Sequence, residues 1–436
     1  MRRSLGPALA LLALPAAALG EERFPPPEFS TGYQMPAPTT PPPRAGTLAV
    51  LDVVLLAVAL SLAAYLVLKR RSRNGVFALM LFSLAYFGFY RNGCVCPIGA
   101  IQNVVVAATD RSYALPAVVA AFFALPLLFA LFFGRVFCAA VCPMGAVQDV
   151  VLARPARIPP WLEHALGLLP YLYLGAAVLF AATGSAFVIC NYDPFVSFFR
   201  MSGTVKLLSL GAAFLLLSMF VGRPYCRFVC PYGVLLRWVA PWARWPVTIT
   251  PDTCTQCRLC EESCPFGAIR VPTPEPDPAL RHEGRGRLAV LLLLLPVLVA
   301  AGGWLGAHGS GRLARAHARV QLADRVWIEE QGKVRGTTDA SEAFRKHGHP
   351  TEELYREAAE LRFRFRDAGR LFGAWVGLVF GLKLILLSIR RRRDNYEADR
   401  AACLACARCY RSCPQEHARL GLVIDETEVP DAVDQR

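Results

Sequence analysis

Long apolar stretches follow one another along most of the chain, separated by shorter polar and basic segments. A helix needs about 20 predominantly apolar residues to cross a hydrocarbon core of about 30 Å. The pattern therefore predicts an all-α membrane protein with about seven transmembrane helices. The candidate spans are residues 47–68, 75–91, 114–137, 165–189, 205–221, 288–306 and 371–389, of which the second and the fifth are short.

Positive charge orients these spans. Lys and Arg collect on the cytoplasmic side of a membrane, and the first and last spans are followed by basic clusters at residues 69–73 and 390–393. Both of these ends are expected inside a bacterial inner (cytoplasmic) membrane. Counting along the chain then places residues 138–164, 222–287 and 390–436 inside, and residues 92–113, 190–204 and 307–370 outside.

The net charge of +14 follows from this topology. A nucleic-acid partner is not expected, because no basic stripe with interleaved aromatic residues occurs away from the membrane flanks. Residues 1–20 carry Arg2 and Arg3 before a short apolar core and predict a signal peptide, with an uncleaved first helix as the alternative. Residues 21–45 are rich in proline and predict an extended periplasmic linker.

The chain has 15 cysteines, and eight of them form two copies of one spacing. Each copy is Cys-x-x-Cys-x-x-Cys-x-x-x-Cys-Pro, the bacterial run for 4Fe–4S clusters, in which the fourth cysteine ligates the other of two clusters. Structural zinc, the alternative, does not use this run. The expected ligand sets are Cys254, Cys257, Cys260 and Cys413 for one cluster, and Cys403, Cys406, Cys409 and Cys264 for the other.

The exchanged fourth cysteines predict a small α+β ferredoxin-like domain made of two distant segments, residues 246–287 and 390–436. Thiols stay reduced in the cytoplasm, which agrees with the inside placement of both segments. Between them, the chain would cross the membrane at 288–306 and return at 371–389. The loop at 307–370 is expected to be a periplasmic helical subdomain, with a solvated connector as the alternative.

A second motif recurs at span ends within the transmembrane core, residues 46–245. The run Gly-Arg-x-x-Cys-x-x-x-Cys-Pro-x-Gly occurs at residues 134–145 and again at 222–233. Cysteines four apart would lie on one face of a helical turn, and the neighbouring arginines would stabilise thiolates. We expect a redox-active dithiol or a further metal centre, with simple packing as the alternative. The candidate relay residues are Cys138, Cys142, Cys226 and Cys230.

Three more cysteines are expected on the outer side, where an outer redox site and a disulfide are equally favoured. They are Cys94, Cys96 and Cys190. His164 and His308 lie at span edges, where either could contact a quinone. Asp52 lies within the first span and is a candidate proton or partner site, because an acid there is costly unless it is wet or paired.

These motifs resemble the NosR/NapH-type membrane polyferredoxins, in which Cys-Pro motifs at span ends accompany two ferredoxin motifs. The resemblance covers residues 46–420, and the run from Cys190 through Asp193, Pro194 and Phe195 is closer to the NosR side. The large outer flavin domain of NosR-like members has no counterpart, since residues 21–45 are far too short for it. Flavin is therefore not expected.

The resemblance implies an electron-transfer component of anaerobic respiration, such as denitrification, rather than a stand-alone enzyme. Its partners would be the quinone pool or a cytoplasmic electron donor on one side, and a periplasmic reductase or electron carrier on the other. In the NosR relatives that role supports nitrous-oxide reduction. The alternative is an assembly or regulatory factor for a periplasmic metalloenzyme, with structural or sensing clusters.

Overall fold

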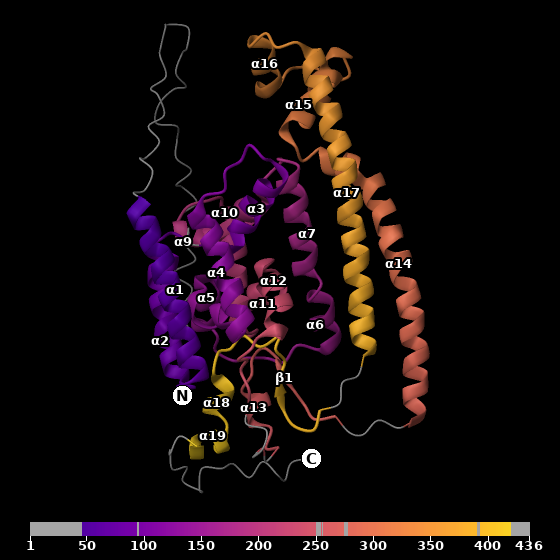
Figure 1. The fold of residues 1–436 in the computed structure, drawn as a ribbon. Coiled ribbons are helices and arrows are strands. Elements are labelled where there is room, and N and C mark those ends of the chain that lie inside the picture. The colour runs from indigo at the N-terminus through magenta and orange to yellow at the C-terminus, as the bar shows by residue number, and fades with distance from the viewer. Residues whose placement is uncertain are drawn as a thin grey trace, which may run out of the picture. The chain divides into compact units, whose positions relative to one another are not determined.

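The computed structural model describes residues 46–93, 96–249, 254, 256–273, 278–389 and 393–419. The expected signal peptide, the proline-rich linker, Cys94 and the basic residues 390–392 lie outside this described part. Helices dominate it (Figure 1), in agreement with the expected fold class.

The helices of residues 46–242 form one packed core. They are α1 (Gly46–Leu68), α2 (Arg73–Ser83), the π-helix η3 (Leu84–Tyr90), α3 (Pro97–Thr109), α4 (Ala117–Phe133), the π-helix η4 (Phe137–Val141), α5 (Pro143–Val150), α6 (Pro160–Leu166), α7 (Leu169–Ala182), α8 (Val188–Tyr192), α9 (Pro194–Arg200), α10 (Val205–Ser218), α11 (Pro224–Phe228), α12 (Tyr232–Val239) and the 3-10 helix η5 (Ala240–Trp242).

Four helices of the described residues are long and apolar enough to cross a membrane: Gly46–Leu68, Pro160–Ala182, Gly284–Ala314 and Thr351–Ser388. The bent pair α9–α10, with 103° between its helices, would make a fifth. The other expected spans are shorter or broken. The stretch 75–91 changes from α2 to the π-helix η3, and the stretch 114–137 gives only the apolar helix α4 of 17 residues.

A further helix follows the second expected span. After a turn at Asn92 and Gly93, which both have positive φ, the chain starts α3 at Pro97 and packs it against α4 and α7. Cys96, directly before α3, therefore lies at a break between two helical segments, and its side chain packs against the core.

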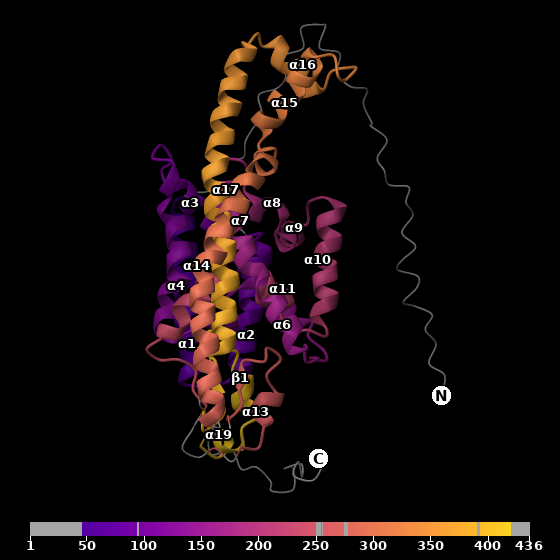
Figure 2. The same cartoon turned by 90° about the vertical axis from the view of Figure 1, so that its right-hand side faces the viewer.

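Two long helices connect the core to the C-terminal segment. α14 (Pro278–Ala314) and α17 (Thr351–Ser388) run side by side (Figures 1 and 2) and share more contacts than any other pair of elements. Glycines allow this approach: a Cβ added at Gly306 would collide with the Gly369 carbonyl oxygen, and one at Gly302 with that of Gly373. At the end remote from the cysteine motifs, α15 (Ala318–Glu330) and α16 (Asp339–Lys346) pack beside α17.

The two cysteine-rich segments meet as one unit, although 37-residue α14 and 38-residue α17 separate them in the chain. β1 (Ile269–Arg270) pairs antiparallel with β2 (Glu397–Ala398), with Ile269 opposite Ala398. The helix α13 (Leu259–Glu262) contacts β1 and α18 (Arg408–Arg411), and α18 in turn contacts α19 (Pro414–Arg419) (Figure 1). We refer to residues 254–273 and 393–419 as the cysteine domain.

The cysteine domain packs against the end of the core where α1 ends and α2 begins. Arg71 forms an ion pair of 2.5 Å with Glu416 and lies over the Tyr410 ring. Arg73 donates a hydrogen bond to the Cys406 carbonyl oxygen at 3.2 Å. The basic cluster that was expected to orient the first span thus contacts the cysteine domain directly.

Candidate functional site: two cysteine sets beside a thiol-lined core

The first cysteine set converges on one small cavity. Its wall contains Cys254, Cys257, Cys260 and Cys413, together with Arg258 and Tyr396. Burial raises the pKa of the Cys260 thiol to about 11, and the charges of the other three thiolates add to this. The fourth cysteine of the C-terminal motif thus lies with the first three of the other motif. Cys257 is exposed, so this set lies at the surface.

The second set converges in the same manner but is more deeply buried. Burial raises the pKa of the Cys403 thiol to about 12, and the neighbouring Cys406 and Cys264 raise it further. Cys409 lies close to Cys403, Cys406 and Cys264, and also to Cys260 of the first set. The two sets are therefore neighbours.

Both cysteine loops share an unusual backbone. Gln256 and Arg258 have φ of 56° and 64°, and the equivalent residues Ala405 and Ala407 have φ of 54° and 61°. Such left-handed conformations in residues other than glycine are uncommon and cluster at ligand sites. Here they turn backbone N–H groups toward sulfur, as when Ala405 N–H donates to Cys403 Sγ at 3.4 Å. Four thiols and inward N–H groups fit a negatively charged iron–sulfur cluster.

The four candidate relay cysteines also come together in the core, where Cys226 is half-buried and the other three are buried. The Cys142 thiol lies close to that of Cys226, and Cys230 lies close to Cys142 and Cys138. The expected single helical turn is wrong for both pairs. η4 ends at Val141 and α11 ends at Phe228, because Pro143 and Pro231 follow the second cysteines and disfavour helix before them.

The geometry distinguishes between kinds of metal centre. In the described part of the chain, no three His, Cys, Asp or Glu side chains converge as one metal ion would require. A cubane makes a different demand, because each thiolate binds its own iron. The distances therefore bear only on a single bound ion, at the core thiols and at the two cysteine sets alike.

The arginines of the two Gly-Arg motifs cross over. Arg223 is fully buried and donates hydrogen bonds to the backbone carbonyls of Cys138 and, at 3.2 Å, Ala139. Arg135 lies 3.7 Å from Cys138 Sγ and donates to the Ala401 carbonyl in the cysteine domain at 3.1 Å. A Cβ on Gly145 would lie 3.1 Å from Arg223, and one on Gly233 would lie 3.6 Å from Arg135. The glycine that ends each motif therefore leaves room for the arginine of the other.

Asp149 is a functional candidate that the sequence analysis missed. Its fully buried carboxylate is 2.5 Å from Arg73, 3.3 Å from Arg223 and 3.3 Å from Arg408. Burial raises its pKa, but the three arginines outweigh burial and hold the pKa well below the ordinary value. The available signal was an acid one turn after the Cys-Pro-x-Gly run, in an otherwise apolar segment.

The cysteines expected outside are partly joined to this core. Cys96 lies close to Cys142 and to the buried Asp193, whose carboxylate accepts a 2.6 Å hydrogen bond from Tyr225. Cys190 Sγ lies 3.2 Å from where a Cβ on Gly99 would be. Among the described residues, neither Cys96 nor Cys190 forms a disulfide with another cysteine.

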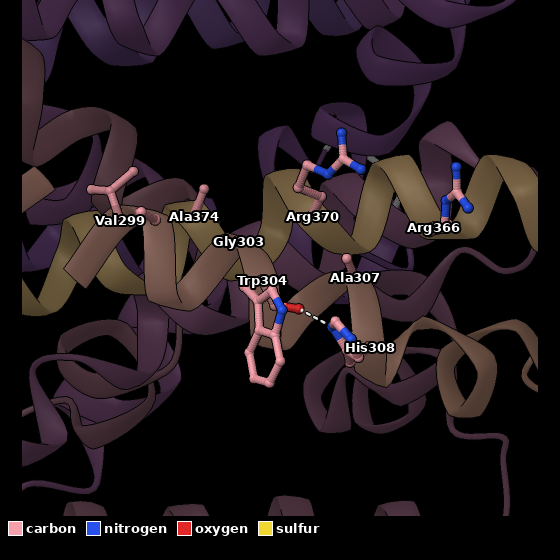
Figure 3. Close-up of a pocket in the computed structure, with 9 residues that line it drawn as sticks. Val299, Gly303, Trp304, Ala307, His308, Arg366, Arg370 and Ala374 are labelled. Carbon is pink, nitrogen blue, oxygen red and sulfur yellow. Dashed lines mark hydrogen bonds between the residues drawn. The ribbon is translucent and has the colours of Figure 1, made fainter. Parts of the chain in front are cut away.

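The remaining polar candidates lie away from the thiols. His164 lies in α6, at the start of the span Pro160–Ala182. His308 lines a groove between α14 and α17 with Trp304, Arg366 and Arg370, and its Nδ1 is 2.9 Å from the Trp304 carbonyl oxygen (Figure 3). No cysteine lines this groove. The described residues that line the groove therefore offer His308 no thiol as a redox partner.

Comparison with known families identifies the two regions that carry these motifs. One 4Fe-4S binding domain family matches residues 115–167 and 205–249, which contain the crossed Gly-Arg motifs. A second 4Fe-4S binding domain family matches residues 247–270, which contain the first ferredoxin motif. No solved structure matches the chain significantly.

Three relatives show the extent of the similarity. The putative electron transport protein YccM of Escherichia coli is 29% identical over 118 residues, 25% of this chain and 33% of YccM. Protein NirI of Paracoccus denitrificans is 30% identical over 125 residues, 27% of this chain and 18% of NirI. The uncharacterized protein MJ0750 of Methanocaldococcus jannaschii is 30% identical over 107 residues, 24% of this chain and 44% of MJ0750. The chain thus matches less than half the length of each.

Fold, motifs and matches together define a membrane protein that binds 4Fe–4S clusters. The matches agree with the resemblance to membrane-bound polyferredoxins of the NosR/NapH type, and they support iron–sulfur electron transfer as the kind of chemistry to consider.

Proposed function

We propose that the protein carries electrons across a bacterial inner membrane, from the cysteine domain to an acceptor on the opposite face. One observation carries this proposal: thiols follow one another from the cysteine domain into the core. Arg223 lies close to Cys406 of the second set and to Cys138 and Cys226 of the relay. Cys142, which lies close to Cys226, is in turn close to Cys96.

The eight cysteines of the two sets would hold two 4Fe–4S clusters, which supply one-electron chemistry when bound. The chain supplies spacing, burial and hydrogen bonds. The four core thiols would hold a further cluster or act as a redox dithiol. Either arrangement shortens the gap that an electron must cross in a hydrocarbon layer of about 30 Å.

The proposed role fits best with a chain that crosses the membrane seven times. In our proposal α2 with η3 and α3 makes one crossing, α4 makes another, and α9–α10 makes a third beside the four long helices. The cysteine domain would then face the cytoplasm, beside the basic residues 69–73. The α15–α16 unit would face the periplasm.

The exposed first cysteine set favours a soluble cytoplasmic donor, which can approach Cys257 without entering the membrane. Quinol remains the rival donor, and the groove at His308 is a place to look for it. A periplasmic respiratory reductase, as in NosR-like denitrification, would be the acceptor. In the other interpretation, an assembly or regulatory factor, the clusters need not exchange electrons across the membrane at all.

The test uses the full chain in sealed vesicles with the α15–α16 side outward. After reduction of the clusters, a membrane-impermeant acceptor is added outside and reoxidation is followed optically. Wild type should reoxidise, whereas Cys142→Ser and Cys230→Ser should keep the eight-cysteine clusters and lose most of the rate. Ala146→Ser, a buried control in the same helix as Pro143, should behave as wild type.

Wild-type reoxidation rates in both cysteine variants would show that the core thiols are not on the electron-transfer path. Absence of reoxidation in wild type, with both clusters intact, would favour the assembly or regulatory role. The two results separate a wrong route from a wrong function.

A further inference from the structure

The two cysteine sets lie in different electrostatic surroundings. Around the second set, four arginines gather with a single buried acid. Arg73 binds the Cys406 carbonyl, Arg408 precedes Cys409, Arg135 lies near Cys403, and Arg223 lies near Cys406. With Asp149 included, four positive charges and one negative charge leave a net +3. We call these five residues the arginine cage.

The cage is buried and held in place. The exposed fractions of the side chains are 9% for Arg73, 0% for Arg223 and 27% for Arg408. Asp149 holds all three through one carboxylate, and they come from three parts of the chain: the start of α2, the residue before α11, and α18. Water screens such a cluster poorly, so its field acts at close to full strength on neighbouring groups.

Charges around the first set nearly cancel. Arg258 lines its cavity, and Glu261 lies close enough to act on the same Tyr396 hydroxyl. Glu416, next to the cavity residue Gln415, is neutralised by Arg71 at 2.5 Å. Exposed Cys257 also opens this site to solvent, which screens what charge remains.

Two effects oppose each other at the second set. A 4Fe–4S cluster becomes more negative on reduction, so burial disfavours the reduced form and nearby positive charge favours it. Burial raises the pKa of the Cys403 and Cys406 thiols although Arg135 and Arg73 oppose the rise, so the second set experiences both effects. Burial also raises the pKa of Cys260 in the first set, and what distinguishes the second set is the buried net charge of +3 beside it. The same cage should stabilise the more negative state of an adjacent cluster.

We propose that Cys403, Cys406, Cys409 and Cys264 hold the higher-potential cluster, so that electrons enter at the exposed first set and move toward the membrane core. This inference rests on the proposed function for the assignment of the eight thiols. In each step one electron leaves the first cluster and enters the second, and no bond is made or broken. The electron comes from a reduced soluble donor, which is oxidised by one electron.

Arg73 is then a positioning residue that acts through the cluster potential. The test is a potentiometric titration of the purified full chain, with EPR of the reduced clusters. Wild type should show two midpoints. Arg73→Gln should lower the higher of the two midpoint potentials and so narrow the difference between them. Arg258→Gln, at the first set, should lower the lower midpoint potential and so widen that difference. Arg73→Lys should retain most of the wild-type gap because it keeps the charge.

Arg270→Gln is the matched control, since it removes an arginine of the same domain whose side chain is 45% exposed and paired with Asp399. It should leave both midpoints in place. If Arg73→Gln fails to bind iron, Arg408→Gln tests the same prediction from the cysteine-domain side of the cage. A shift of the lower midpoint by either cage variant, or no shift at all, would overturn the assignment.

Midpoints are equilibrium quantities measured in detergent, so they do not depend on transfer across a membrane. Wild type could fail to be reoxidised in vesicles while Arg73→Gln still narrows the difference between the two midpoint potentials. This result would reject the transmembrane route but not the order of the two potentials. Iron for a single cluster in wild type would reject both.

Discussion

The Arg91 guanidinium lies 2.7 Å from the carboxylate of Asp52, which is completely buried in α1. Tyr86 donates a second hydrogen bond to the same carboxylate at 2.9 Å. The acid that the sequence marks as a candidate proton or partner site is thus paired within the core. It fastens α1 to the end of η3, next to the break before Cys96.

The first prediction concerns this pair. Asp52→Ala should lower the free energy of unfolding in detergent by about 3–5 kcal/mol, because it leaves Arg91 without its buried partner. Asp52→Leu combined with Arg91→Leu should recover much of that loss. Asp110→Asn, an exposed acid, serves as the control. Normal stability in Asp52→Asn with abolished electron transfer would instead support a proton-carrying role.

The second prediction concerns the exchanged cysteines. Purified anaerobically, wild type should hold about eight irons in two cubanes if the core thiols bind none, and about twelve if they hold a third. Cys413→Ala and Cys260→Ala should damage the same EPR signal, and Cys264→Ala and Cys409→Ala the other. If Cys413→Ala and Cys409→Ala removed one common signal, each motif would bind its own cluster.

The third prediction concerns topology. Reporter fusions at residues 73, 250 and 430 should indicate the cytoplasm, and a fusion at residue 340, in α16, should indicate the periplasm. Alkaline phosphatase and a fluorescent protein give opposite readouts and control for expression. Opposite faces for 250 and 430 would be incompatible with the β1–β2 pairing.

The fourth prediction concerns pH and the α15–α16 unit. Burial raises the pKa of Glu329, but hydrogen bonds from Ser341, Arg325 and Arg345 outweigh it and keep the pKa below its ordinary value. A lowered folded-state pKa stabilises the unit above the ordinary pKa of Glu, about 4.3, and this is lost as pH falls through the folded value.

Glu329→Gln should therefore speed hydrogen exchange of the α16 amides at neutral pH, and the difference from wild type should shrink as the pH falls below about 4. Glu342→Gln, an exposed acid on α16, is the control. A difference between wild type and Glu329→Gln that stays constant down to pH 3 would show that the glutamate stabilises the unit without its charge.

Much of this architecture can be predicted from the sequence because the strongest signals are local. The span 288–306 lies inside α14, the span 371–389 ends one residue beyond α17, and the first span differs from α1 by one residue at its start. The cysteine spacing also indicated which thiols would lie together. In the structure Cys413 lies with the first three cysteines of the N-terminal motif, and Cys264 lies with the first three of the C-terminal motif.

Features that depend on packing could not be predicted in this way. Hydropathy cannot locate the π-helix at η3, because that stretch is apolar throughout, and it does not give the 103° angle between α9 and α10. The contact of Asp149 with Arg73, Arg223 and Arg408 joins residues separated by 76, 74 and 259 positions. The motif did indicate an arginine near the thiols, but not that each arginine reaches across into the other motif.

The long excursion through α14 and α17 has a consequence for synthesis of the protein. Cys264 and Cys413 are 149 positions apart, which takes roughly 7–30 s at a translation rate of about 5–20 residues/s. During that interval the first motif is already made, yet neither cubane can acquire its full set of ligands. Iron–sulfur loading must therefore wait until the ribosome has finished the last span, and the nascent thiols need protection from oxygen and stray metals until then.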